Sequence, residues 1–568
     1  MRSRSLALSA AAALLVLAVV WAAPSRVVDA DALSRLAMGR LLVEHARAPL
    51  HDPWTFGAPE VPFGNPEWLG DLAWYALYER FGERGLQAAA VSCGALGYVL
   101  ALALGITLGG RPASVLALLL CTLPAAAPRI SPRNDVHLFW LFPVLCWLCA
   151  REPPSARRWL GLLALGAVWA NLHSSFVVAW PFLLLALRAS TPVVRRWAVF
   201  VVLAYPALPF LGPSGASSYR QLLDHLLGAG VYRSLLSEWQ SPLSSTGWLA
   251  IMPLYVLIVL GAGSFIAERP RALQVLMFGV GCALALASRR FLPAMAYLVA
   301  PAMAGPLEAA AMRLGRSARW LALAAAASLL AYLALAARSS AQRQQASVFD
   351  PDERQAAIAF LREHAPRGSR VANAFNDGPW LLWFGHGAFQ HYLDPRNNLG
   401  ARVLERYVHE VIADASAFER EAERLRIDLV LVPQRDPAWS ALLAHLSGAA
   451  RWRLSYWDGR YALFARDAPQ LRAFLERHAY RAIAPTLDLR YLARRATSAP
   501  DLEADLTRLA SQSRVHATVI RAYLQLREAG GRGPRAVQAA QAIEAAWPQL
   551  DDTAGLAQAL QEIESGRR

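Results

Sequence analysis

The sequence predicts a polytopic α-helical membrane domain, followed by a small α/β domain and a C-terminal all-α helical region. Three observations lead to this fold class. The 568 residues are 55% hydrophobic and only 17% charged, whereas soluble proteins carry about 25% charged residues. Long apolar runs alternate with short arginine-rich links up to residue 338. From residue 340 onward, the composition is that of an ordinary soluble chain.

The apolar runs predict about eleven membrane crossings, because about 30 Å of hydrocarbon requires roughly 20 apolar residues in a helix. The first run could be an uncleaved helix or a signal peptide, and we favour the helix because Trp21-Ala22-Ala23 is a poor cleavage site. The predicted runs are 6–23, 86–108, 113–127, 136–150, 159–172, 174–188, 197–212, 247–266, 272–288, 291–307 and 319–337.

The arginines predict the orientation of these helices. Fourteen of them flank one alternate set of short links and six lie in the opposite set, and the richer set is expected in the cytoplasm. We therefore expect a multi-pass protein of the plasma (inner) membrane with a cytoplasmic N-terminus. The transmembrane domain is 1–338, its first loop, 24–85, is external, and the C-terminal part is extracytoplasmic.

The net charge of +15 does not indicate a nucleic-acid partner. The chain contains no lysine, and many arginines flank apolar runs, where the orientation of membrane helices explains them. All five cysteines lie inside apolar runs, so the sequence offers neither a disulfide framework nor a zinc knuckle. The partner that the composition does predict is the lipid bilayer.

The second part divides at residue 468. Residues 339–468 alternate helical patterns with short runs rich in Val, Ile, Leu, Tyr and Phe, which predicts an extracytoplasmic α/β domain. It contains no glycine-rich phosphate loop of the GxGxxG kind. Residues 469–568 contain amphipathic stretches separated by Gly and Pro, which predicts a C-terminal helical region.

Two carboxylates, Asp29 and Asp31, directly follow the first apolar run. Two such groups in an irregular segment can share a divalent cation. One of them could instead act as a general base, and Asp31 could simply be the N-cap of the helix that follows. The residues alone leave all three interpretations open, and with them the presence of a metal.

Further polar side chains gather on the predicted external side. They are Arg129, Arg133, His173, Glu238, Arg289 and Arg290. Charged groups at a membrane boundary are costly unless they line a wet cavity or find partners. We therefore expect these side chains to meet the carboxylates of the first loop at one external active site.

Short motifs follow one another in a recognisable order along the chain. They are "DALSRLAMG" at 31–39, "DPWT" at 52–55, "PEWL" at 66–69, "WANLHSSF" at 169–176, "SEWQSP" at 237–242, "RRFLP" at 289–293, "NDGPWL" at 376–381 and "YLDPRNN" at 392–398. This order resembles the GT-C superfamily of membrane glycosyltransferases, and more narrowly a group of bacterial polytopic proteins of that type. The group has His at two positions where this chain has Arg35 and Pro66, which places the activity in doubt if either His is essential.

The resemblance implies transfer of a sugar from a polyprenyl-phosphate donor to a glycan, lipid or protein acceptor at the external face. Asp31 is then the expected catalytic base, with Asp29 second. Arginine suits a phosphate, so Arg289 and Arg290 are expected to bind it, followed by Arg129 and Arg133. The remaining substrate-binding candidates are Asp52, Glu67, Trp68, His173, Glu238 and Trp239. Some members need a divalent cation, and Asp29 and Asp31 would bind one.

Two alternatives stay open. The chain could be a non-catalytic relative that binds a glycan or an envelope partner, which the loss of the two His residues supports. It could also be a transporter or lipid flippase, although transporters place charged sites near the membrane midplane, and the middles of these runs are largely Ala, Leu and Val.

Overall fold

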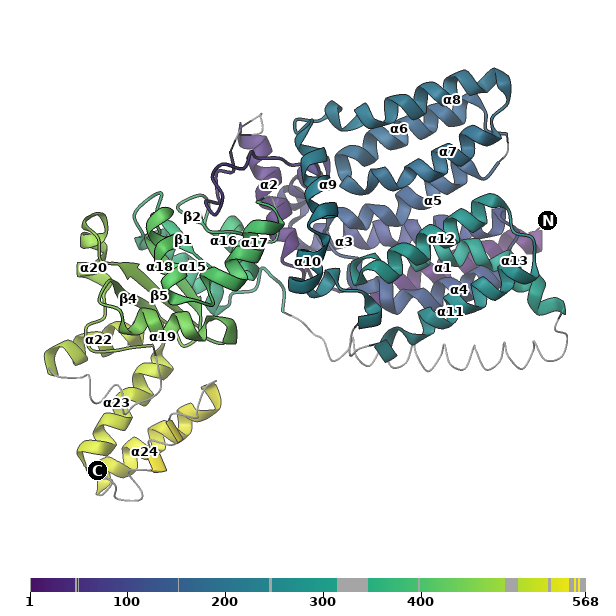
Figure 1. The fold of residues 1–568 in the computed structure, drawn as a ribbon. Helices are drawn as coiled ribbons and strands as arrows, with labels where there is room; N and C mark the ends of the chain where they lie inside the picture. Colours follow the sequence, from purple (N-terminus) through teal and green to yellow (C-terminus); the bar gives the residue numbers. More distant parts are fainter. Residues whose placement is uncertain are drawn as a thin grey trace. The chain divides into compact units, whose positions relative to one another are not determined.

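The computed structural model divides into two compact units, and their boundary does not follow the order of the chain. Unit 1 contains residues 1–50 and 62–350, and unit 2 contains residues 51–61 and 351–568. Figure 1 shows the helices of unit 1 and the smaller mixed elements of unit 2. The structure describes the whole chain except residues 1, 46–48, 50, 152, 245–247, 314–345, 397–398, 486–498, 530–532, 551–555, 558–559 and 562–568.

The described residues of unit 1 are mostly helical, and short loops join the helices. Each predicted apolar run from 6–23 to 291–307 coincides with helix, and the run 319–337 lies outside the described residues. The α-helices are α1 (Arg2–Ala22), α2 (Asp31–His45), α3 (Trp68–Thr107), α4 (Pro112–Ala126), α5 (Leu138–Cys149), α6 (Ala156–Leu172), α7 (Trp180–Ala189), α8 (Pro192–Ala204), α9 (Ser217–Leu227), α10 (Ala229–Leu235), α11 (Trp248–Ala267), α12 (Ala272–Ala287) and α13 (Ala300–Arg313).

Short helical turns join these helices. They are η1 (Ala127–Arg129), η2 (Asn134–His137), η3 (Ser174–Ala179), η4 (Tyr205–Leu211), η5 (Ser237–Trp239), η6 (Pro242–Ser244), η7 (Arg289–Phe291) and η8 (Met295–Val299).

Four helical segments of the described residues are long and apolar enough to cross a membrane. They are Trp68–Thr107, Pro112–Arg129, Pro192–Leu211 and Met295–Arg313. Shorter apolar helices accompany them at Leu8–Ala22, Asn134–Cys149, Ser174–Ala189, Leu254–Ala267 and Ala272–Ala287. Eleven crossings and a cytoplasmic N-terminus stay predictions.

Helix α2 and the first turns of α3 lie within the stretch that the sequence assigned to an external loop. Helix α2 packs against α3, and Gly39 allows this contact, because a Cβ atom there would lie 2.3 Å from the Asp71 carbonyl oxygen. Within α3 the helix breaks at Gly82, whose φ of 61° favours glycine. The segment 68–81 can thus depart from the direction of the long apolar helix that follows it.

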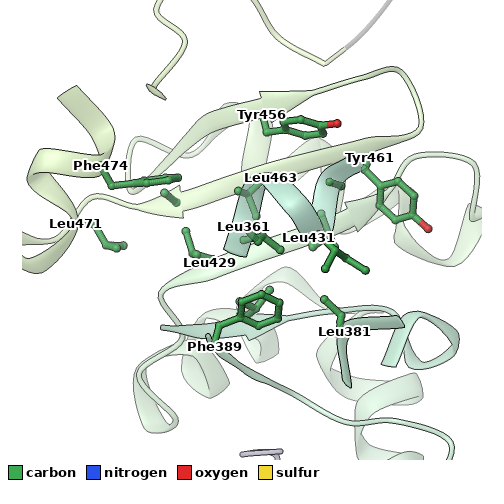
Figure 2. Packing of buried hydrophobic residues seen from close by; sticks show 14 residues of the cluster. Leu361, Leu381, Phe389, Leu429, Leu431, Tyr456, Tyr461, Leu463, Leu471 and Phe474 are labelled. Atoms are coloured by element: carbon green, nitrogen blue, oxygen red, sulfur yellow. The ribbon is translucent and has the colours of Figure 1, made fainter. Parts of the chain in front are cut away.

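Unit 2 is built on a five-stranded mixed sheet in the order β2-β1-β3-β5-β4. Strand β1 pairs in parallel with β2 and β3, whereas β5 pairs antiparallel with β3 and β4. Buried side chains of α15, α16 and α20 pack with those of the strands, as Figure 2 shows. The strands are β1 (Arg370–Ala372), β2 (Gln390–His391), β3 (Leu429–Pro433), β4 (Trp452–Trp457) and β5 (Tyr461–Arg466).

The helices of unit 2 include the predicted C-terminal region, which belongs to the same compact unit as the sheet. Buried Asp505 of α22 accepts hydrogen bonds from the backbone N–H groups of Arg481, Ala482 and Ile483. The helices are α15 (Glu353–His364), α16 (Gly378–Phe384), α17 (Ala401–Arg406), α18 (Ala415–Arg424), α19 (Ser440–Gly448), α20 (Arg472–His478), α22 (Ala499–Gln512), α23 (Arg514–Glu528) and α24 (Pro534–Ala546). The turns are η9 (Phe375–Asp377), η10 (Tyr407–Val411), η11 (Pro437–Trp439), η12 (Pro469–Leu471) and η13 (Trp547–Gln549).

Residues 51–61, which we name the inserted strand, extend this sheet beside β2. Thr55 pairs in parallel with His391, whose N–H donates to the Trp54 carbonyl at 2.8 Å. The N–H of Phe56 donates to the His391 carbonyl at 3.1 Å, and that of Gly57 to the Tyr392 carbonyl at 2.9 Å. The inserted strand therefore satisfies backbone groups that an exposed sheet edge would leave open.

A buried ionic network fixes the inserted strand. The Arg396 guanidinium donates from Nη2 to Asp52 at 2.9 Å and to Asp394 at 2.7 Å, and His391 binds the same Asp394 at 2.8 Å. The side chains of Arg396 and Asp52 are 3% and 5% exposed. The "DPWT" and "YLDPRNN" motifs, far apart in the sequence, therefore bind each other inside unit 2.

Replacing Asp52 should destabilise unit 2. Asp52→Asn leaves part of the charge of buried Arg396 uncompensated, although Asp394 remains, so we expect a loss of about 2 kcal/mol in the free energy of unfolding. Asp467→Asn is the matched control, because Asp467 lies 3.7 Å from Arg453 with both side chains about half exposed, and it should cost less than about 1 kcal/mol. Denaturant unfolding of the full chain in detergent measures both. Equal losses would contradict the network.

Candidate active site

A cluster of charged side chains in unit 1 is built from five separate segments of the chain. The segments are 29–35, which starts α2; 65–71, which starts α3; 129–135, between α4 and α5; 237–239, which is η5; and residue 290 in η7. Each segment ends or begins a helix, where the backbone leaves the regular hydrogen-bonding pattern and side chains can converge. The sequence predicted this convergence of the first-loop carboxylates with Arg290.

Arg133 lies among the carboxylates of the first loop. Its Nη1 lies 2.8 Å from Asp29 Oδ2, and its Nη2 lies 2.7 Å from Asp31 Oδ2. Its Nε is 3.5 Å from Asp135 Oδ1. The guanidinium is planar with N–H donors on several edges, so it can bind several carboxylates together. The Arg133 side chain is only 11% exposed. A guanidinium this far from water needs the opposite charge that these carboxylates supply.

Glu238 is the meeting point of three arginines. Its Oε2 lies 2.9 Å from Arg129 Nη2 and 3.5 Å from Arg133 Nη2, and its Oε1 lies 3.7 Å from Arg290 Nη1. The backbone around it is tied to η7: Ser288 donates its hydroxyl to the Glu238 carbonyl at 2.7 Å, and Arg289 N–H donates to the Gln240 carbonyl at 3.0 Å.

A second group surrounds Glu67 at the start of α3. Arg35 Nη1 lies 2.8 Å from Glu67 Oε2 and 3.3 Å from Asp71 Oδ1. Asn134 donates to Asp71 Oδ1 at 2.7 Å, and His173 Nε2 lies 3.5 Å from Glu67 Oε1. Arg35 stands where the resembling group has His, and here it acts as the counter-charge for two buried acids.

Trp239 belongs to a stack of rings beside these charges. The rings of His225 and Trp239 lie nearly parallel, 5.5 Å apart, and Tyr232 stacks on Trp239 at 5.2 Å. The Arg290 guanidinium lies over Trp239, 4.9 Å from the ring centroid. Tyr232 donates its hydroxyl to Asp224 at 2.6 Å. An aromatic face next to charged groups is suited to stacking a sugar ring.

Three predicted residues take other places. Asp52 belongs to unit 2, where its carboxylate binds Arg396 and so holds the inserted strand. Trp68 donates from Nε1 to Asn171 at 2.7 Å. The backbone N–H of Arg289 donates to the Gln240 carbonyl. Of the two neighbouring arginines, Arg290 is the one whose guanidinium lies near Glu238 among the described ion pairs. The substrate-binding roles proposed for them stay predictions.

Burial and charge set the acidities in the loops of this cluster. Burial raises the pKa of Asp31 to about 6 against the opposing charge of Arg133. For Glu238, burial also disfavours the ionised form, but Arg290, Arg133 and Arg129 outweigh it and lower the pKa to about 2. Burial also opposes ionisation of Glu67, but Arg35, His173 and the Asn134 hydrogen bond together lower its pKa. Asp31 is thus a proton acceptor near neutral pH, whereas Glu238 stays ionised.

The arrangement does not fit a divalent cation shared by Asp29 and Asp31. The Arg133 guanidinium contacts one oxygen of each carboxylate and so takes the place between them. Among the described residues, no group of three or more His, Cys, Asp or Glu side chains could hold a metal ion. We derive no step through a metal.

Several members of the cluster were not predicted as site residues. Asp71 lies four residues after Glu67, a spacing that places both on one face of a helix. His225 and Tyr232 precede the predicted Trp239 by fourteen and seven residues, a regular spacing that was a detectable signal. Asn134 and Asp135 stand directly after Arg133, and their position could not be inferred because the segment around them is irregular.

The apolar helices of unit 1 indicate a polytopic membrane protein. The oligosaccharyltransferase of Archaeoglobus fulgidus, solved with a tethered acceptor peptide, is similar with a TM-score of 0.50 and 12% identity, over 79% of this chain and 72% of that one. The mycobacterial arabinofuranosyltransferase AftD gives 0.49 and 14%, over 81% of this chain and 41% of that one. ArnT of Cupriavidus metallidurans, bound to undecaprenyl phosphate, gives 0.44 and 13%, over 81% and 98%.

The likeness to the oligosaccharyltransferase concerns the fold alone, and it confirms the GT-C-like fold that the sequence resemblance implies. No protein-family model and no curated protein matches the sequence.

Removing Arg133 should destabilise unit 1. Arg133→Met leaves Asp29 and Asp31 buried without their counter-charge, and we expect a loss of about 3 kcal/mol in the free energy of unfolding. Asp31→Asn in the same chain should recover part of this loss, because an amide needs no cation. Unfolding in detergent measures both variants. Arg313→Met is the control, because Arg313 is 69% exposed beside Glu268, and a cost as large as that of Arg133→Met would contradict the assignment.

Proposed function

We propose that the chain is an integral-membrane glycosyltransferase that moves a sugar from a polyprenyl-phosphate donor to an acceptor on the external face of the membrane. The observation that supports it most is the convergence, within the GT-C-like unit, of Asp31 with the arginines around Glu238. The arginine bias of the links supports the external location, because it predicts a cytoplasmic N-terminus.

The proposed reaction needs a base, an anion site and a surface for the sugar. The acceptor hydroxyl oxygen attacks the sugar carbon that carries the phosphate, a new C–O bond forms, and the bond to the phosphate oxygen breaks. The hydroxyl proton passes to Asp31, whose pKa of about 6 suits a general base. The leaving phosphate keeps the electron pair, and Arg129 and Arg290 stabilise its charge. Trp239, which lies beside Arg290, is the aromatic residue proposed to contact the sugar.

Asp31→Asn should abolish sugar transfer. An amide cannot accept the hydroxyl proton, and loss of a general base costs about 10²–10⁴-fold in rate. The assay follows transfer from a polyprenyl-phosphate-linked sugar by purified protein in lipid nanodiscs. Asp350→Asn is the control, because Asp350 pairs with Arg26 outside the cluster. Retained activity of Asp31→Asn would remove Asp31 from the role and make Asp29 the next residue to test.

The rate of transfer should fall as the pH is lowered through about 6. Asp31 works as a base only when ionised, and its protonated fraction grows below its pKa of about 6, so the rate should level off above pH 7. The measurement is kcat/KM against pH at constant ionic strength. A rate that stays constant between pH 5 and 8 would contradict the assignment of Asp31.

A second candidate is a non-catalytic relative that binds a glycan or an envelope partner. Arg35 supports it, because in place of His it ties Glu67 and Asp71 into an ion pair. A wild-type protein that binds lipid-linked sugar and transfers none, for any acceptor class tested, would favour this candidate over the enzyme.

A further inference from the structure

Three arginines surround Glu238 in unit 1. Arg133 is also paired with Asp29 and Asp31, whereas Arg129 and Arg290 keep buried donors that Glu238 and the other described residues leave unpaired. Glu238 makes one short contact, 2.9 Å to Arg129, and two longer ones of 3.5 and 3.7 Å to Arg133 and Arg290. A carboxylate has two oxygens, whereas three guanidinium groups present many more N–H donors than it can accept.

The unused donors are buried beside Glu238. Among the described residues, Arg129 Nη1 and Arg290 Nε have no hydrogen-bond partner, and neither does Trp239 Nε1 of the adjacent residue. Arg129 Nη1 lies 3.6 Å from Asp135 Oδ2, which is too long for a hydrogen bond. Leaving a buried donor unpaired costs about 1–3 kcal/mol. The site is therefore incomplete with a carboxylate in it.

A phosphate group fits these donors better than a carboxylate does. The polyprenyl phosphate that leaves is a monoester with three terminal oxygens and a charge of about −1.5 to −2 near neutral pH, and arginine binds such groups through paired N–H groups. We propose that Glu238 is a stand-in anion, which occupies the phosphate position of the donor site and must be displaced before a phosphate can bind. The proposal rests on the proposed function in one respect, namely that the phosphate belongs to a lipid-linked donor.

The structure allows this displacement without a change of fold. The Glu238 side chain is 34% exposed, whereas those of Arg129, Arg133 and Arg290 are between 11% and 17% exposed. The Glu238 carbonyl is bound by Ser288, and the Gln240 carbonyl by the Arg289 N–H. The backbone of this segment is therefore held to η7 at two points, Glu238 and Gln240, and rotation of the Glu238 side chain alone would open the site.

The sequence alone pointed to the opposite role, in which Glu238 helps to bind the sugar. The two roles predict effects of opposite sign. If Glu238 binds substrate, its neutral isostere weakens binding. If Glu238 competes with phosphate, the isostere strengthens binding, because the fraction of protein with a vacant anion site rises.

The test is the binding of three probes to the full-length protein in nanodiscs at pH 7.5. The probes are undecaprenyl phosphate, the neutral lipid undecaprenol and inorganic phosphate. Glu238→Gln should bind undecaprenyl phosphate about tenfold more tightly than the wild type, and its affinity for undecaprenol should not change. If Glu238→Gln also binds inorganic phosphate more tightly, the site recognises the phosphate group itself. If the affinity for inorganic phosphate does not change, the site recognises the lipid-linked form.

Two further variants guard the interpretation. Glu238→Asp keeps the charge on a side chain one methylene shorter, so it should tighten binding less than Glu238→Gln does. Asp350→Asn removes a carboxylate of matched exposure, 35%, that pairs with Arg26, and it should leave binding unchanged.

Unchanged, weaker or undetectable binding of undecaprenyl phosphate by Glu238→Gln overturns the proposal, as does equal tightening by Asp350→Asn. The outcome is independent of sugar transfer. A Glu238→Gln protein that binds lipid phosphate more tightly but transfers no sugar would contradict the glycosyltransferase and keep the stand-in anion. If the wild type transfers sugar and Glu238→Gln binds lipid phosphate no more tightly, the glycosyltransferase is supported and the stand-in anion is contradicted.

Discussion

The charged cluster of unit 1 depends on the contact between the Arg133 guanidinium and the carboxylates of Asp29 and Asp31. Taking ions out of water costs several kcal/mol each, and only close pairing offsets this cost. The cluster contains more carboxylates than guanidinium groups. Counted over the described ion pairs, six carboxylates (Asp29, Asp31, Glu67, Asp71, Asp135 and Glu238) face four guanidinium groups (Arg35, Arg129, Arg133 and Arg290). Two formal negative charges remain.

This excess of acid connects binding to chemistry in the proposed reaction. Burial raises the pKa of Asp31 to about 6, and the neighbouring carboxylates Asp29 and Glu238 add to this effect against Arg133. As the bond to the sugar breaks in the proposed reaction, the phosphate leaving among Arg129, Arg133 and Arg290 gains negative charge close to Asp31, which shares Arg133 with Glu238. The departure of the phosphate thus increases the proton affinity of the base, at the step where a proton has to be taken from the acceptor.

Sequence reasoning reached the fold class and much of the cluster for a physical reason. Charged side chains at helix ends in an apolar chain need partners, so Asp31, Arg133 and Arg290 could be expected together before their contacts were known. The alternation of patterns after residue 339 likewise indicated the mixed sheet. The number of crossings was harder, since several runs are too short to be assigned by length alone.

The position of Asp52 could not be inferred for a different reason. Its motif lies between two segments of unit 1, and nothing in its local sequence shows that Thr55 forms a bridge with His391. Register between distant strands is decided by side chains on both of them, which a reading of one segment cannot provide. For Asp71 the helical spacing from Glu67 was visible, but its burial followed only from the packing of α2 on α3.

The inserted strand also determines the order in which the protein can be assembled. Asp52 precedes Arg396 by 344 residues, so the ribosome completes the strand long before the sheet that receives it, and most of unit 1 is synthesised in between. Contacts between such distant segments form slowly. The hydrophobic stretch Trp54–Phe56 must wait unpaired throughout translation of unit 1, and the nascent chain therefore needs protection at this point until β2 has emerged.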